Sequence, residues 1–109
     1  MFKMAIQGEN FVSLVGKIVW PELKVVGDTN SQLFKAKLAI PINDRFQYIK
    51  ISGWNSVAED LNEVNNNVFV KIHGHIEERS YDGKCKHCNG LEKKYWTEVV
   101  VDNFIIVED

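Results

Sequence analysis

Hydrophobic and polar residues alternate with a period of two along much of the chain. Between residues 33 and 40 every second residue is apolar, and Lys35 and Lys37 fall on the opposite face. Because successive side chains of a β-strand point to opposite sides, this alternation predicts a half-buried strand. Related patterns predict strands at residues 11–19, 46–54, 68–76, 95–101 and 104–107. At Trp20-Pro21 the first strand is expected to break, because proline lacks the ladder donor, with pairing resuming at 23–26.

One segment carries a helical pattern. Ser56-Val57-Ala58-Glu59 fits a capping box, in which serine and glutamate side chains satisfy the free amides at the start of a helix. Val57, Leu61 and Val64 then share one face. The predicted order of three strands, one helix and two strands favours an all-β fold. We expect a five-stranded Greek-key barrel of the OB type with its helix between strands 3 and 4. Strand order alone leaves other small barrels and sandwiches open.

Composition narrows the class of protein. The 109 residues are 45% hydrophobic and 26% charged, which predicts a single globular domain over residues 1–109. No apolar run approaches the ~20 residues of a membrane span, and the first residues lack a secretory signal, so we expect a cytoplasmic protein with no membrane partner. The net charge of −2 counts against a nucleic-acid ligand, although local potential matters more than the sum.

The strand predicted at residues 46–54 carries the most informative side chains. Ile49 and Ile51 are predicted to point into the core, and the opposite face then holds Phe46, Tyr48, Lys50, Ser52 and Trp54. Exposed rings interleaved with cations suit a single-stranded nucleic acid, because bases stack on the rings and lysines hold the phosphates. Lys35 and Lys37 add cations to the same surface. The alternative is that the rings cover the barrel end or an oligomer contact.

A basic segment joins the last two long strands. Residues 79–96 hold five cations and three rings, namely Arg79, Lys84, Lys86, Lys93, Lys94, Tyr81, Tyr95 and Trp96. We expect a long hairpin that closes over a bound strand, or else a solvated loop. Cys85 and Cys88 have the spacing of half a zinc site, but zinc takes four ligands and a second pair is lacking. A zinc site completed by another subunit and a pair of free thiols both remain open.

Catalytic motifs are not found in the sequence. There is no Gly-rich phosphate loop, no H-E-x-x-H and no G-x-S-x-G. Glu77 and Glu78 are adjacent on a predicted strand, so they face opposite ways and do not form a carboxylate pair. We therefore expect a protein that is not an enzyme and that needs no cofactor.

Six short motifs, in the right order, resemble the bacterial-type single-stranded DNA-binding protein family. They are residues 10–18, 21–23, 34–39, 54–59, 70–76 and 97–101, so the resemblance covers nearly the whole chain. It implies an OB fold, stacking of bases on aromatic rings, and assembly into homodimers or homotetramers. By position it places stacking aromatics at Tyr48, Trp54 and Tyr81.

The chain departs from this family in three places. The loop at residues 41–45 is short and lacks the family's aromatic residue, which Phe46 is placed to replace. The hairpin with Cys85 and Cys88 is an uncommon variant. The sequence ends at Val107-Glu108-Asp109 without the family's acidic tail, so recruitment of replication or recombination proteins through a tail is not expected. A short variant of this kind suits a bacterial, phage or plasmid protein.

The sequence therefore predicts sequence-independent binding of single-stranded DNA in replication, recombination or repair. The expected contacts are Lys35, Lys37, Phe46, Tyr48, Lys50, Trp54, Arg79, Tyr81, Lys84 and Lys86. One alternative is an OB-fold adaptor that binds proteins of a replisome or primosome, and another is a zinc-dependent DNA- or RNA-binding module using Cys85 and Cys88. Stacking and phosphate contacts do not distinguish DNA from RNA.

Overall fold

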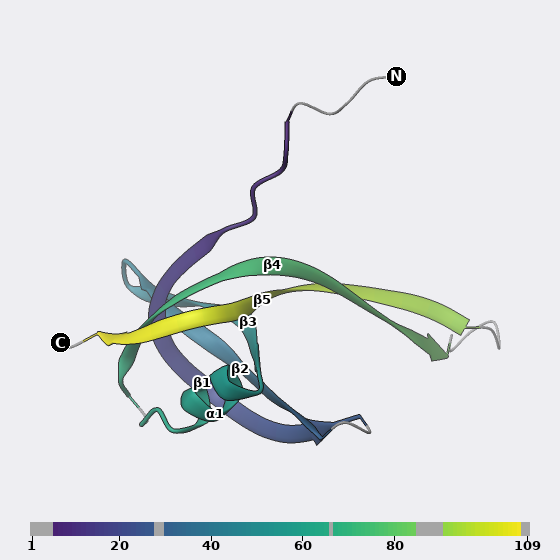
Figure 1. The fold of residues 1–109 in the computed structure, drawn as a ribbon. Helices are drawn as coiled ribbons and strands as arrows, with labels where there is room; N and C mark the ends of the chain where they lie inside the picture. The colour runs from purple at the N-terminus through teal and green to yellow at the C-terminus, as the bar shows by residue number, and fades with distance from the viewer. Residues whose placement is uncertain (1–5, 28–29, 66, 85–90, 108–109) are drawn as a thin grey trace.

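The computed structural model describes residues 6–27, 30–65, 67–84 and 91–107, and the side chains of 81–84, 91 and 92 are not described. Within these ranges the chain forms β1 (Val12–Val26), β2 (Ser31–Ile42), β3 (Arg45–Trp54), α1 (Ser56–Asn62), β4 (Phe69–Lys84) and β5 (Leu91–Val107) (Figure 1). The strands close into a barrel in the order β1-β2-β3-β5-β4. This is the five-stranded OB architecture, so the predicted fold class is confirmed.

Pairing around the barrel is antiparallel except at one seam. β3 and β5 run parallel and pair only at Ile51 with Val99 and Ser52 with Val100. β4 and β5 instead pair along their whole length, from Phe69 with Val107 to Lys84 with Leu91. Figure 1 shows this hairpin extending well beyond the rest of the barrel. Much of the basic segment at residues 79–96 is therefore strand, and β3 and β5 diverge on one side of their short seam.

The barrel interior is filled by the apolar faces that the alternation predicted. Phe34 and Leu38 of β2 are fully buried, and Ile51, Val70 and Ile72 are at most 1% exposed. Helix α1 covers one end of this core with Ala58 and Leu61. A side chain at Gly53 would meet Leu61 Cδ1 at 2.9 Å, so the glycine is what allows the helix to pack this closely against β3.

The start of the helix differs from the predicted capping box. The N-cap is Asn55, and no side chain caps the helix. Asn55 is tied to β2 instead: its backbone N–H donates to the carbonyl of Gln32 at 2.9 Å, and its Oδ1 accepts from the Gln32 N–H at 3.1 Å. The turn into the helix is therefore fixed by the neighbouring strand, which a local motif does not reveal.

Ser52 is a second correction to the sequence-based picture. Alternation predicts that it lies on an exposed face, but it is 1% exposed and its hydroxyl has no hydrogen-bond partner among the described residues. Ser52 lies between Lys35 of β2 and Val100 of β5, at the point where β3 is paired on both sides. The exposed part of the β3 face is thus limited to its first half, at Phe46, Tyr48 and Lys50.

Strand β1 continues through the position where a break was expected. Its register with β2 shifts between Val19 and Glu22, and Trp20 has a φ of 52°. A left-handed conformation is rare for a bulky residue, and bulges of this kind redirect a side chain out of the regular pleat. The result is that the Trp20 side chain stands 65% exposed beside β2. No helix in the described part of the chain is long and apolar enough to cross a membrane.

Candidate functional site

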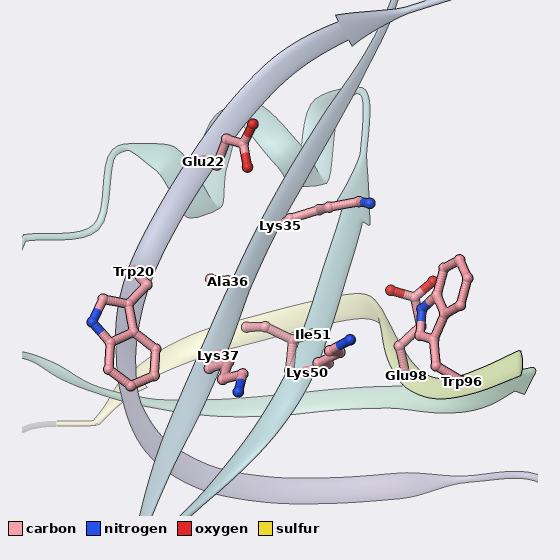
Figure 2. A pocket seen from close by; sticks show the side chains of 9 residues that line it. All are labelled: Trp20, Glu22, Lys35, Ala36, Lys37, Lys50, Ile51, Trp96 and Glu98. Atoms are coloured by element: carbon pink, nitrogen blue, oxygen red, sulfur yellow. The ribbon is translucent and has the colours of Figure 1, made fainter. Parts of the chain in front are cut away.

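An open groove of about 350 Å³ crosses β1, β2, β3 and β5 (Figure 2). We use "the groove" for the nine residues that line it: Trp20, Glu22, Lys35, Ala36, Lys37, Lys50, Ile51, Trp96 and Glu98. In Figure 2, Trp20 stands on one side, Trp96 and Glu98 on the other, and the lysines of β2 and β3 lie between them. The bulge in β1 supplies the first wall, and the divergence of β5 from β3 supplies the second.

A second hollow of about 430 Å³ adjoins the groove. Both are lined by Lys37, Lys50 and Glu98, and the second continues past Tyr48 to Ile76. The two hollows therefore lie next to each other and share three charged side chains.

Three lysines and two glutamates line the groove, and two of the lysines lie next to tryptophan rings. Lys37 and Lys50 lie directly opposite each other on β2 and β3, an arrangement that is unfavourable for like charges. Lys37 Nζ lies 5.7 Å from the ring centroid of Trp20, and Lys50 Nζ lies 5.8 Å from that of Trp96. Ring faces attract cations at such distances, which offsets part of the repulsion. Among the described residues no ion pair includes Lys35, Lys37 or Lys50, so their charges are available to a ligand.

The rings beside the groove support one another. Trp20 stacks on Tyr48 with centroids 5.4 Å apart and planes 27° apart. The ring centroid of Phe46 lies 6.5 Å from that of Tyr48, so Phe46 is a third ring in this cluster. All three rings are about half exposed or more, at 65%, 49% and 47% for Trp20, Tyr48 and Phe46. An aromatic surface of this extent can hold flat ligands by their faces.

A network of ion pairs runs along β4 and β5 next to the groove. Its contacts are Asp102 Oδ2–His75 Nδ1 at 3.0 Å, His75 Nε2–Glu77 Oε2 at 2.7 Å, Glu77 Oε1–Arg79 Nη2 at 3.1 Å and Arg79 Nε–Glu98 Oε1 at 2.8 Å. Hydrogen bonds to Asp102 and then Glu77 raise the pKa of His75 above 6.5, against a smaller desolvation effect. We call these five residues the ion-pair network.

A bulge places Asp102 next to His75 at one end of this network. The β4–β5 register shifts between His73 and Gly74, which leaves Asp102 as an extra residue on β5 beside His75. Any side chain at Gly74 would fall on the carbonyl oxygen of Val100, so the two strands approach this closely only because the residue is glycine. The network ends at Glu98, which belongs to the groove as well.

The structure brings some of the predicted contact residues together. Lys35, Lys37 and Lys50 line the groove, Tyr48 lines the adjoining hollow, and Phe46 lies against Tyr48. Trp54 is half-buried at the end of β3, opposite Leu33 of β2, and is not among the groove residues. Arg79 is held by Glu98 and Glu77.

The remaining predicted residues fall at the tip of the hairpin. Tyr81 and Lys84 belong to β4, but their side chains are not described. Cys85, Lys86 and Cys88 lie outside the described residues. Contacts of this tip with DNA, and zinc binding by the two cysteines, therefore stay predictions.

Sequence reasoning did not select Trp20, Trp96 or Glu98 as contact residues, although all three line the groove. Trp96 and Glu98 carried only the signal that they share one face of a predicted strand, because residues 99–101 are all valine and alternation there does not mark the core face. Trp20 carried a weaker one, a large ring immediately before a proline within a strand pattern.

Comparisons with known proteins place the fold. No protein-family model and no curated protein sequence matches the chain. Among solved structures, it is similar to a crystal structure of a deletion mutant of the single-stranded DNA binding protein from Thermus aquaticus, with a TM-score of 0.73 and 16% identity. The match covers 99% of this chain and 46% of that one, so the chain spans less than half of that protein's length. The likeness shows a shared OB-type fold, in agreement with the resemblance seen in the sequence.

Proposed function

We propose that this protein binds single-stranded DNA along the groove. Bases stack on Trp20 and Trp96, while Lys35, Lys37 and Lys50 hold the phosphates. The observation that carries the proposal is the pair of opposed lysines, each over a tryptophan ring and each without a carboxylate partner among the described residues. Such a pair is unfavourable in the free protein and becomes favourable when a polyanion lies between the rings.

The chemistry of the groove favours a single strand. Bases of a duplex are stacked on one another and their faces are not available, whereas an unpaired strand offers both bases and phosphates to rings and cations. Stacking on each ring contributes about 1–3 kcal/mol and every base has a π-face, so the main contacts tolerate any sequence. The solved protein of similar fold is a single-stranded DNA binding protein, which supports a binding role without catalysis for this chain. A place in replication, recombination or repair follows as part of the proposal.

The direct test is a fluorescence titration with oligo-dT at low salt. Binding should quench tryptophan emission, because two of the three tryptophans stand in the groove, and affinity should fall as salt is added. The variant Trp54→Phe removes the third tryptophan and should keep the quenching. Unchanged emission at micromolar protein and low salt would contradict the proposal. An RNA of equal length, titrated in parallel, decides between the two nucleic acids.

A separate face, on which exposed apolar side chains flank Lys71, supports self-association. Val15, Lys71 and Ile105 lie side by side across β1, β4 and β5, and Val15 and Ile105 are 41% and 59% exposed. Phe11, 72% exposed, extends this face along the chain. We propose that two or four copies assemble through it, since exposed apolar patches of this kind mark protein contacts. Light scattering should show an oligomer that Val15→Glu dissociates. A monomeric wild-type protein that instead forms a tight complex with a replisome protein would favour the adaptor alternative.

A further inference from the structure

Glu98 is out of place in a groove that receives a polyanion. It is 7% exposed, yet it lines both the groove and the adjoining hollow. A carboxylate beside a phosphate would oppose binding by like-charge repulsion. Its position therefore suits the part of the ligand that is not charged, which in a nucleic acid is the edge of a base.

Arg79 holds this carboxylate in one orientation. Arg79 Nε donates to Glu98 Oε1 at 2.8 Å, and Arg79 Nη2 is fixed in turn by Glu77 Oε1 at 3.1 Å. A buried acceptor whose direction is set by a second residue is preorganised, so it need not be ordered when a ligand arrives. A carboxylate also accepts hydrogen bonds without donating any while it is ionised.

The neighbours of Glu98 place a base next to it. Trp96 and Glu98 are two positions apart on β5 and share one face, about 6–7 Å apart along the strand. Figure 2 shows the carboxylate beside the indole ring. Lys50 Nζ lies 5.8 Å from the same ring and marks where the phosphate binds. A base that stacks on Trp96 with its phosphate at Lys50 thus has Glu98 within reach of its hydrogen-bonding edge.

We propose that Glu98 reads the edge of the base stacked on Trp96 and favours bases with an exocyclic amino group over thymine. The inference rests on the proposed function and adds a preference at one nucleotide position to otherwise sequence-tolerant binding. The amino group of cytosine donates a hydrogen bond to a carboxylate, whereas thymine has a carbonyl oxygen at the same place and is repelled. Adenine and guanine also carry amino groups, so the class favoured is amino-bearing bases.

The test compares two ligands that differ at this edge. Oligonucleotides of 5-methyl-dC and of dT have equal length, the same methyl group and rings of the same size, and are titrated at mildly alkaline pH. In Glu98→Gln the ratio of the 5-methyl-dC affinity to the dT affinity should fall by about fivefold, the lower end of base-edge discrimination. The matched control is Glu78→Gln, which also removes one negative charge from β4, whereas Glu78 neither lines the groove nor pairs with Arg79. Its ratio should equal that of the wild type.

Two outcomes would overturn the inference while leaving DNA binding intact. One is an unchanged ratio in Glu98→Gln, and the other is an equal fall in Glu78→Gln, which would trace the effect to net charge. If circular dichroism shows that Glu98→Gln does not fold, the ligand is changed instead. N4,N4-dimethyl-dC lacks both donors and should bind the wild type several-fold more weakly than 5-methyl-dC, and equal affinity would sink the idea. Failure of every oligonucleotide to bind would reject the proposed function itself.

Discussion

Two neighbouring regions use similar charged residues in opposite ways. In the groove, Lys37 and Lys50 face each other and lie over tryptophan rings. In the ion-pair network, His75 and Arg79 each contact two carboxylates. Among the described residues, no ion pair includes a groove lysine, whereas both basic side chains of the network are paired with carboxylates.

The difference explains how a chain with a net charge of −2 can offer a polyanion site. Charges that pair with one another contribute little to the electric field felt by a ligand. The field of unpaired charges is instead concentrated in a groove whose walls have a low dielectric constant. Asp102, Glu77 and Glu98 lie on the side of the groove next to β4, so they also limit where a polyanion can spread. Net charge alone misjudges such a surface because it does not say which charges are paired.

The largest effect is expected from removing the two walls of the groove. Trp20→Ala with Trp96→Ala should weaken oligo-dT binding by about 1–3 kcal/mol for each ring, measured by anisotropy with a labelled oligonucleotide. The matched control is Tyr95→Ala, because Tyr95 is 60% exposed, adjoins Trp96 in sequence and points to the other face of β5. An equal loss in Tyr95→Ala would mean that the bases do not follow the groove. The groove would then not differ from the ion-pair network in its role in binding.

The sequence was most informative where a side chain's direction depends on local alternation alone. Alternation places Lys35 and Lys37 opposite Phe34 and Leu38, and the structure has them so. The same rule failed at Ser52, because the strand is covered on both edges there by partners distant in sequence. Burial at a given step of a strand depends on which other strands pair with it, and period-two patterning does not contain that information.

The site was less predictable because two bulges shape it. Trp20 reaches the groove because its own backbone is left-handed and it lies at a shift in the register between β1 and β2. The sequence predicts a DNA contact for Arg79, whereas in the β4–β5 register Arg79 lies opposite Trp96 and its side chain pairs with Glu98. Cross-strand partners depend on register over the whole hairpin, and a one-residue bulge at Gly74 changes them all. The role of Arg79 in DNA binding stays a prediction.

A smaller effect is expected from the groove lysines. Lys37→Gln with Lys50→Gln should lower the slope of log affinity against log salt by about 0.7 for each phosphate that is no longer neutralised. The control is Lys24→Gln with Lys93→Gln, two lysines on other strands and outside the groove, which changes the net charge equally. A control slope as low as that of the groove variant would show that overall charge, rather than the unpaired lysines, governs binding.

The smallest effect should come from the Asp102–His75 end of the ion-pair network, and it should concern stability rather than binding. The pKa of His75 is raised by Asp102 first and Glu77 second, so the folded state binds the proton more tightly than the unfolded chain. The resulting stabilisation is fully present below the unfolded pKa of about 6.5 and is lost as the pH rises through the higher pKa of the folded state. Because His75 and its partners are 31–54% exposed, solvent screening limits the gain to about 0.2–1 kcal/mol.

Urea unfolding of His75→Gln at a pH below 6 and at mildly alkaline pH tests this prediction. The loss of unfolding free energy relative to wild type should be larger at the lower pH, and the dependence should shrink in an Asp102→Asn background, as a double-mutant cycle requires of coupled residues. Oligo-dT affinity at either pH should stay close to wild type, since His75 does not line the groove. An equal loss of stability at both pH values would mean that His75 acts through packing or a neutral hydrogen bond. A marked loss of DNA affinity would instead mean that the network and the groove are one functional unit, because a region that only stabilises the barrel has no reason to alter binding.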